Sequence, residues 1–137
     1  MDINEVVNYI SQHWSMEIKR NPRIESIVTL RKIIKIYIDI HGTLIEYPAR
    51  FYIGVKRDHI IIPGVYCSCK DYVIHVMSEK KSKACIHLFA EEAAKEKNLY
   101  RTIVIDINTL YKIINEIMLF DRSPTLRRIL YKKPYRK

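Results

Sequence analysis

The fold of this chain is decided in one window, residues 67–87, which reads CSCKDYVIHVMSEKKSKACIH. The window contains all three cysteines of the 137 residues, in a Cys-x-Cys pair at Cys67 and Cys69 and a Cys-x-His pair at Cys85 and His87. Fifteen residues separate the two pairs. Two residues that are separated by one other residue in an extended strand point their side chains to the same side, so Cys67 and Cys69 can bind one ion together.

The second pair requires a different local structure. Residues two apart on a regular helix point in nearly opposite directions, so Cys85 and His87 can share an ion only where a helix begins. We therefore expect Cys85 to precede a helix and His87 to lie in its first turn. A helix N-terminus also favours a thiolate, which helps Cys85 to ionise. Three thiolates and one imidazole form a closed tetrahedral set, which predicts one structural zinc ion and no site for a catalytic water.

Two alternatives to this ligand set are open. In the first alternative, the cysteines bind no metal and are ordinary buried residues, because free cysteine favours the protein core. His75 replaces His87 as the fourth ligand in the second, although its expected position in the middle of a helix separates it from both pairs. The other histidines, His13, His41 and His59, have no partner by sequence and are expected at the surface or at strand ends.

Length and charge limit the class of protein. The chain has room for one domain, and its 48% of hydrophobic residues can build a core. Its formal net charge of +9 indicates a polyanionic partner, most simply nucleic acid, with a well-solvated basic surface as the alternative. The first residues do not resemble a secretory signal, and the apolar runs are far shorter than the roughly 18 residues of a membrane helix. We expect a protein that is cytoplasmic or nucleoid-associated, not secreted, with no membrane contact and no small-molecule substrate.

The pattern of apolar and turn residues predicts an α+β fold, in which a small antiparallel sheet leads into a zinc-stapled ββα unit between N- and C-terminal helices. Strands are expected at residues 32–40, 43–46, 50–55, 59–62 and 102–107. Helices are expected from Asp2, at residues 71–80 and 84–97, from an Asn108 cap through Phe120, and from Ser123-Pro124. Residues 23–30 fit a helix or a strand. We expect one domain at 1–121, with the zinc unit at about 50–97, and a basic tail at 122–137.

The two pairs resemble the SWIM zinc-finger signature, Cys-x-Cys followed by Cys-x-His, over roughly residues 50–97. Tyr72, three residues after Cys69, occupies a position where SWIM domains often have an aromatic residue. Ala90 extends the second pair to Cys-x-His-x-x-Ala, which looks like the version in the small SWIM subunit of the Shu recombination complex and its archaeal relatives. Alanine is also common there in other SWIM domains and in ordinary helices. A small side chain one turn after His87 would let the helix approach the metal.

The resemblance implies a non-enzymatic accessory protein of DNA recombination or repair that binds a RecA-family recombinase paralogue, DNA or both. The alternatives are a pure protein-interaction module and a small transcription regulator, although no helix-turn-helix with a basic recognition helix is evident. An enzyme is least expected, because there is no phosphate-binding glycine loop, catalytic carboxylate pair or nucleophile motif. The candidate phosphate contacts are Lys70, Lys80, Lys81, Lys83, Arg127, Arg128, Lys132 and Lys133. Tyr131 and Tyr135 are candidates for stacking on unpaired bases, unless the tail is simply a solvated end.

Overall fold

The computed structural model describes residues 22–70 and 85–132. Several predictions made from the sequence lie outside these ranges. They are the helices from Asp2 and at residues 71–80, and the roles considered for His13, Tyr72, His75, Lys80, Lys81, Lys83, Lys133 and Tyr135.

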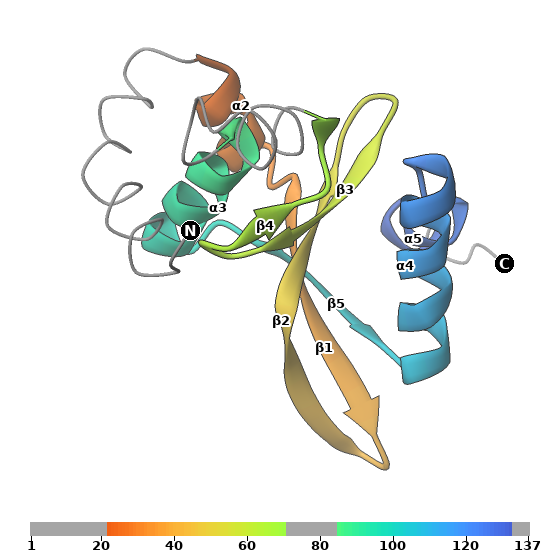
Figure 1. Cartoon of the computed structure of the whole chain (residues 1–137). Coiled ribbons are helices and arrows are strands. Elements are labelled where there is room, and N and C mark those ends of the chain that lie inside the picture. The colour runs from red at the N-terminus through yellow and green to blue at the C-terminus, as the bar shows by residue number, and fades with distance from the viewer. Residues whose placement is uncertain (1–21, 71–84, 133–137) are drawn as a thin grey trace, which may run out of the picture.

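The described residues form a five-stranded sheet with helices on both faces, which confirms the predicted α+β class (Figure 1). The strands are β1 (Ile33–Ile40), β2 (Thr43–Ile53), β3 (Asp58–Ile62), β4 (Tyr66–Cys67) and β5 (Arg101–Ile105), in the order β4-β3-β2-β1-β5. The helices are α2 (Pro22–Thr29), α3 (Ile86–Lys97), α4 (Ile107–Phe120) and α5 (Pro124–Leu130). The ambiguous segment 23–30 is therefore helical, with Pro22 at the first helical position, where its missing N–H is not needed.

The sheet is mixed rather than purely antiparallel. Strands β1 to β4 pair antiparallel in succession, but β5 pairs parallel with β1. A parallel neighbour needs a long crossover connection, and here the chain passes through β4 and α3 before it returns as β5. The sequence pattern of β5 shows a strand but not its partner, so its direction could not be predicted.

Strand β2 is continuous, whereas the sequence predicted two strands separated at Pro48. Lys35 of β1 pairs with Arg50 and Tyr37 pairs with Glu46, so three residues of β2 lie opposite one residue of β1. Within β2, only residues 50–53, which follow this irregularity, pair with β3. Because Pro48 lies at an irregularity of the ladder, its missing N–H does not interrupt the strand.

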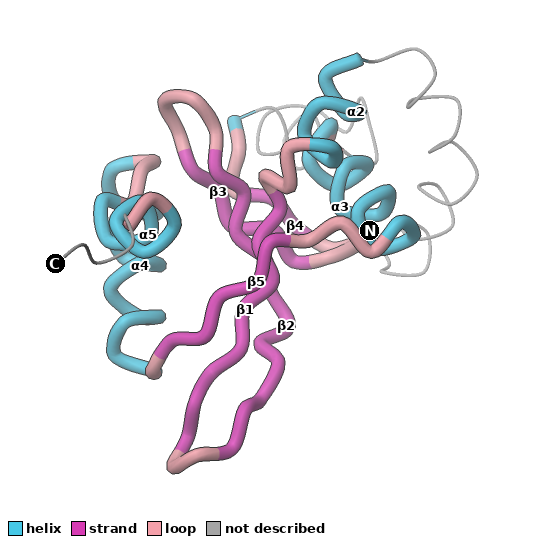
Figure 2. The backbone as a smooth tube through the Cα atoms, turned by 180° about the vertical axis from the view of Figure 1, so that it is seen from behind, coloured by secondary structure: helices cyan, strands magenta, loops and turns pink. Residues whose placement is uncertain are grey.

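Two cores lie on opposite faces of the sheet, one under α2 and α3 and the other under α4 and α5 (Figure 1 and Figure 2). Strand alternation divides the apolar residues between them, with Ile33 in the first core and Ile34, Ile36 and Ile38 in the second. The α2–α3 core is formed by Ile24, Ile27, Val28, Ile33, Tyr52, Ile61, Cys67, Cys69, Cys85, Leu88, Phe89, Ala90, Ala93 and Ala94. The α4–α5 core is formed by Ile34, Ile36, Ile38, Phe51, Ile53, Ile103, Ile105, Leu110, Ile113, Ile117, Leu126 and Leu130.

Both C-terminal helices begin with a side-chain cap. The carboxylate of Asp106 accepts the Thr109 N–H at 2.8 Å, so α4 begins before the predicted Asn108 cap. The Ser123 hydroxyl accepts the Leu126 N–H at 3.0 Å, which confirms the predicted start of α5. Leu126 and Leu130 are buried, so the packed part of the chain continues past residue 121, where the sequence predicted the start of a tail.

Candidate metal centre

A tight turn delivers the first cysteine to the sheet edge. The Val65 N–H donates to the Ile62 carbonyl at 2.9 Å, and Gly64 has φ +71° at the third position of this turn. Pro63 followed by a residue with positive φ is the pattern of a type II turn. Cys67 then pairs with Ile61 across the β3–β4 hairpin.

Ser68 fixes the conformation of the Cys-x-Cys pair. Its N–H donates to the Ile60 carbonyl at 3.0 Å, and its hydroxyl accepts the Ile60 N–H at 2.9 Å. Both bonds hold the chain against β3 between the two cysteines. Cys67 and Cys69 are both buried, on the side of the sheet that faces α3.

The second pair lies at the beginning of α3, as the spacing predicted. Cys85 is the N-cap residue, with φ −99° and ψ 171°, and the helix runs from Ile86. Its carbonyl accepts the N–H groups of Leu88 and Phe89 at 3.1 and 3.3 Å. His87 is therefore in the first turn, and its imidazole can face the same point as the Cys85 thiol.

The four side chains converge on one point between the hairpin and the helix. The three sulfurs and one imidazole nitrogen lie within 4.8 Å of one another, and all four residues are buried. His87 Nδ1 is 3.7 Å from Cys67 Sγ and 4.0 Å from Cys85 Sγ. Metal–sulfur and metal–nitrogen bonds of ordinary length place such atoms about 3.6 Å apart in a tetrahedron. None of the cysteines forms a disulfide, so the cluster can hold one metal ion.

The raised pKa values of the buried thiols indicate that the cluster requires a cation before its cysteines can ionise together. Contacts with Cys69 and Cys85, together with burial, raise the pKa of Cys67 far above its usual range. The contact with Cys67 lowers the pKa of Cys85, but the contact with Cys69 and burial raise it to about 12. Negative charges this close in a buried site repel one another, so the thiols ionise together only when a cation neutralises them. Metal binding here must therefore release protons.

Two aromatic rings of the β2–β3 hairpin pack against His87. Its ring centroid lies 4.3 Å from that of Tyr52 and 4.9 Å from that of His59. Tyr52 and His59 are paired in the strand register, and their rings stack 5.6 Å apart at an interplanar angle of 5°. Burial lowers the pKa of His59, and the neighbouring His87 adds to this effect. These contacts hold the imidazole ligand in place from the side of the sheet.

His59 is a residue that the sequence analysis missed. We expected it at the surface or at a strand end without a partner. It does lie near the start of β3, but it is half-buried and its ring contacts His87 of the candidate metal site. The signal was the cross-strand register, because a four-residue loop between β2 and β3, residues 54–57, places residue 59 opposite residue 52. The pairing of residues 52 and 59 can be predicted from the sequence only if the ends of the β2–β3 loop are known.

The other predicted site residues that the structure describes lie at different places in the molecule. Ala90 is fully buried in the α2–α3 core, and Lys70 is exposed directly after Cys69. Arg128 and Lys132 are exposed and line an open pocket of about 620 Å³ together with Arg127 and Tyr131. We call this the C-terminal basic pocket. It is formed by α5 and the two residues after it, and α5 packs on the face of the sheet opposite α3 (Figure 1).

Arg127 is engaged within the protein. Its guanidinium forms a two-pronged ion pair with the buried Asp58, with Nη2–Oδ1 at 2.7 Å and Nε–Oδ2 at 3.1 Å. The Arg127 side chain is only 14% exposed. Its charge is therefore largely used inside the fold, which leaves Arg128 and Lys132 as the more accessible cations of this pocket.

No protein-family model, curated protein or solved structure matches the chain. Among the described residues, no helix is long and apolar enough to span a bilayer. The geometry of the Cys67, Cys69, Cys85 and His87 cluster is thus the main guide to function.

Proposed function

We propose that this chain is a non-enzymatic zinc-finger protein of SWIM type, which acts as an accessory factor in DNA recombination or repair. The observation that carries this proposal is the buried cluster of three cysteines and one histidine between the β3–β4 hairpin and the start of α3. In this reading one zinc ion joins the two elements, and the surfaces around them bind DNA and a RecA-family recombinase paralogue.

The donor set favours zinc with a structural role. Thiolate and imidazole donors in a tetrahedral arrangement suit zinc, and a set of four protein ligands leaves no position for an activated water. All four ligands are buried, which supports a metal that stabilises the fold. His87 Nε2 is buried without a hydrogen-bond partner among the described residues, so Nδ1, which faces the sulfurs, is the ligand atom.

The proposed binding of DNA is supported by the net charge of the chain and by the C-terminal basic pocket. The chain has a net charge of +9, and Arg128 and Lys132 present accessible cations beside the exposed ring of Tyr131. The Arg101 guanidinium donates to the Leu130 carbonyl and lies 5.9 Å from the Tyr131 ring centroid, which holds the end of α5 against β5. Such a surface binds phosphates without reading sequence, and its affinity falls steeply with salt.

The recombinase partner follows only from the Cys-x-His-x-x-Ala pattern. A second candidate function, a protein-interaction module, is favoured by a separate observation. Ile107, Tyr111 and Met118 of α4 are 47%, 61% and 59% exposed, and their spacing places them on one side of the helix, away from the core. Both functions predict a protein partner, and they differ in DNA binding.

The test is a native pull-down from the host, analysed by mass spectrometry, combined with DNA titrations of the tag-free protein. We expect one zinc per chain, a recombinase paralogue among the captured proteins, and DNA affinity that decreases with salt. Zinc with a different partner and no DNA binding would favour the interaction module. Specific binding to one duplex sequence would instead favour a transcription regulator.

A further inference from the structure

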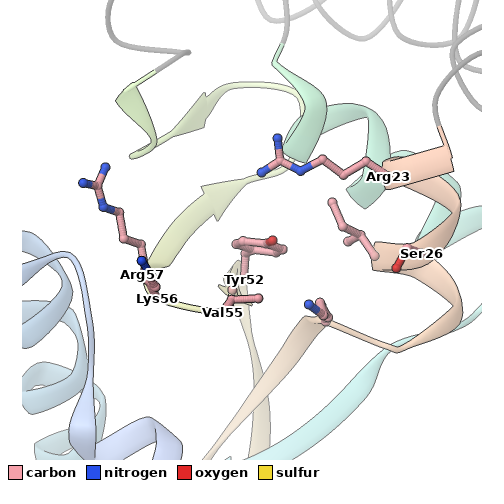
Figure 3. Close-up of a pocket in the computed structure, with 9 residues that line it drawn as sticks. Arg23, Ser26, Tyr52, Val55, Lys56 and Arg57 are labelled. Carbon is pink, nitrogen blue, oxygen red and sulfur yellow. The ribbon is translucent and has the colours of Figure 1, made fainter.

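A second basic pocket lies between α2 and the turn that joins β2 to β3, in a region that the sequence analysis did not single out (Figure 3). The pocket has a volume of about 450 Å³. Among the described residues, four cationic residues and Ser26 contribute to its lining, and no acidic residue does. The cations are Arg23, Lys32, Lys56 and Arg57. We call this site the α2–turn pocket.

The pocket joins three segments that are held together by backbone hydrogen bonds. The Ile53 N–H donates to the Lys32 carbonyl at 3.1 Å, which ties the start of β1 to the end of β2. The Gly54 N–H donates to the Arg57 carbonyl at 2.9 Å and closes the turn. A Cβ on residue 54 would lie 2.5 Å from that carbonyl oxygen, so only glycine allows this turn.

Arg127 holds the same turn from the other side of the molecule. Its Nη2 donates to the Gly54 carbonyl at 2.9 Å while its guanidinium pairs with Asp58, the first residue of β3. The Asp58 N–H donates to the Asp121 carbonyl at 2.7 Å. These bonds fix the turn, so Lys56 and Arg57 are presented from a rigid loop rather than from a flexible one. Preorganised groups lose less entropy when they bind a ligand.

Three of the four cationic residues of the pocket have no ion-pair partner among the described residues. Lys32, Lys56 and Arg57 form no ion pair there, and the last two are exposed. Figure 3 shows Arg23 and Arg57 on opposite sides of Tyr52, with Lys56 and Val55 on the turn below. Like charges gathered around one cavity attract an anion, which reduces their mutual repulsion.

We propose that the α2–turn pocket binds the phosphodiester backbone of a nucleic acid strand, with Lys56 and Arg57 as phosphate contacts. This inference rests on the nucleic-acid part of the proposed function and assigns it a surface. The volume exceeds what a single phosphate needs and falls in the range of sites for larger ligands. One wall of the pocket is Tyr52, whose ring also contacts His87, so the metal centre supports the pocket directly.

The test compares two double variants with the same change of charge. Lys56→Gln with Arg57→Gln neutralises the turn, and Lys95→Gln with Lys97→Gln neutralises two exposed residues of α3 that line neither basic pocket. Affinity for single- and double-stranded oligonucleotides is measured by fluorescence anisotropy between about 50 and 200 mM salt. Each lost contact lowers the slope of log K against log salt by about 0.9 for duplex DNA, so we expect the turn variant to lose about 1.8. The α3 variant should keep the wild-type slope.

Three results would overturn the inference, and they are distinguishable. Wild-type binding with an unchanged slope in the turn variant would remove this pocket and leave the proposed function intact. No oligonucleotide binding by the wild type at low salt would remove the pocket and the nucleic-acid part of the function together. Binding of a nucleoside monophosphate that is lost in the turn variant, without oligonucleotide binding, would assign the pocket to a small phosphorylated ligand. Zinc content and melting curves of both variants verify that they are folded.

Discussion

The α2–α3 core and the α4–α5 core pack on opposite faces of one sheet, but they contain different side chains. In the part of the chain that the structure describes, the buried residues of the α4–α5 core are all isoleucine, leucine or phenylalanine. Among the described residues, the α2–α3 core contains three cysteines and three alanines in a total of fourteen buried residues. Small side chains let α3 approach the hairpin closely, yet they remove less apolar surface from water than leucine or isoleucine does.

This difference indicates where each side obtains its stability. The α4–α5 side is stabilised by apolar burial, by the caps at Asp106 and Ser123 and by the ion pair between Arg127 and Asp58, and none of these needs a metal ion. The α2–α3 core places three thiols in a buried cluster, which is unfavourable for their ionised form until a cation binds. Structural zinc in small domains supplies about 10–16 kcal/mol of apparent binding free energy, much of which becomes folding free energy. We therefore expect the two sides of the sheet to respond differently to loss of metal.

The largest effect is expected from the metal ligands. Cys85→Ser or His87→Ala should release zinc and lower the free energy of unfolding by several kcal/mol, because three buried ligands then lack their cation. Zinc content and thermal unfolding with and without a chelator measure this. Ile113→Ala is the matched control on the other side, where a cavity should cost about 2–5 kcal/mol without loss of zinc. Equal zinc content and equal melting temperatures in the ligand variants and the wild type would contradict the claim that the α2–α3 side depends on a metal ion.

The next largest effect is expected at the ion pair that connects α5 to the β2–β3 turn. Asp58→Ala leaves Arg127 mostly buried without its partner, which should cost about 3–5 kcal/mol. Denaturant unfolding measures the loss, and the zinc content should not change. The double variant Asp58→Asn with Arg127→Met should recover part of the stability, because it leaves no unpaired charge. A loss below about 1 kcal/mol in Asp58→Ala would show that the pair is not important for stability.

A smaller effect is expected from pH on the α2–α3 side. Glu91 of α3 is 2% exposed, and burial raises its pKa to about 7, although the Tyr100 hydrogen bond and the Arg50 guanidinium act in the opposite direction. Arg50 Nε lies 3.8 Å from Glu91 Oε2, too far for a hydrogen bond. Burial therefore outweighs the ion pair.

The sign of the pH dependence follows from this pKa. Between the ordinary value of 4.5 and about 7, the folded protein keeps a proton on Glu91 that the unfolded chain has lost. The free energy of unfolding therefore decreases as pH rises through this window, by about 3 kcal/mol in all. Glu91→Gln should remove this component. The difference between wild type and variant at each pH cancels the contribution of the metal ligands, and a pH-independent difference would contradict the prediction.

The smallest effect is expected when the chain is truncated after Leu130. The truncation removes Tyr131 and Lys132 from the C-terminal basic pocket but keeps the buried residues of α5. DNA affinity should decrease and the salt slope should become shallower by about one contact for each of Lys132 and Lys133 that binds a phosphate, while the melting temperature changes little. An affinity equal to that of the full chain across the salt series would exclude a role for this end of the chain.

The sequence was sufficient where the information is local. The cysteine spacing predicted the cluster, and the rule for residues two apart on a helix predicted that α3 begins after Cys85. It was insufficient where the partner is distant. Arg127 was predicted as a phosphate contact, but it pairs with an aspartate sixty-nine positions earlier. The parallel pairing of β5 and the contact of His59 with His87 depend on three-dimensional neighbours in the same way.

The most direct test of this account is the metal content of the purified, tag-free protein, measured by elemental analysis alongside the reactivity of its thiols under native conditions. The account predicts one zinc ion per chain and three cysteines that react only after a chelator is added. A protein without bound metal whose cysteines react freely while it remains folded would contradict it.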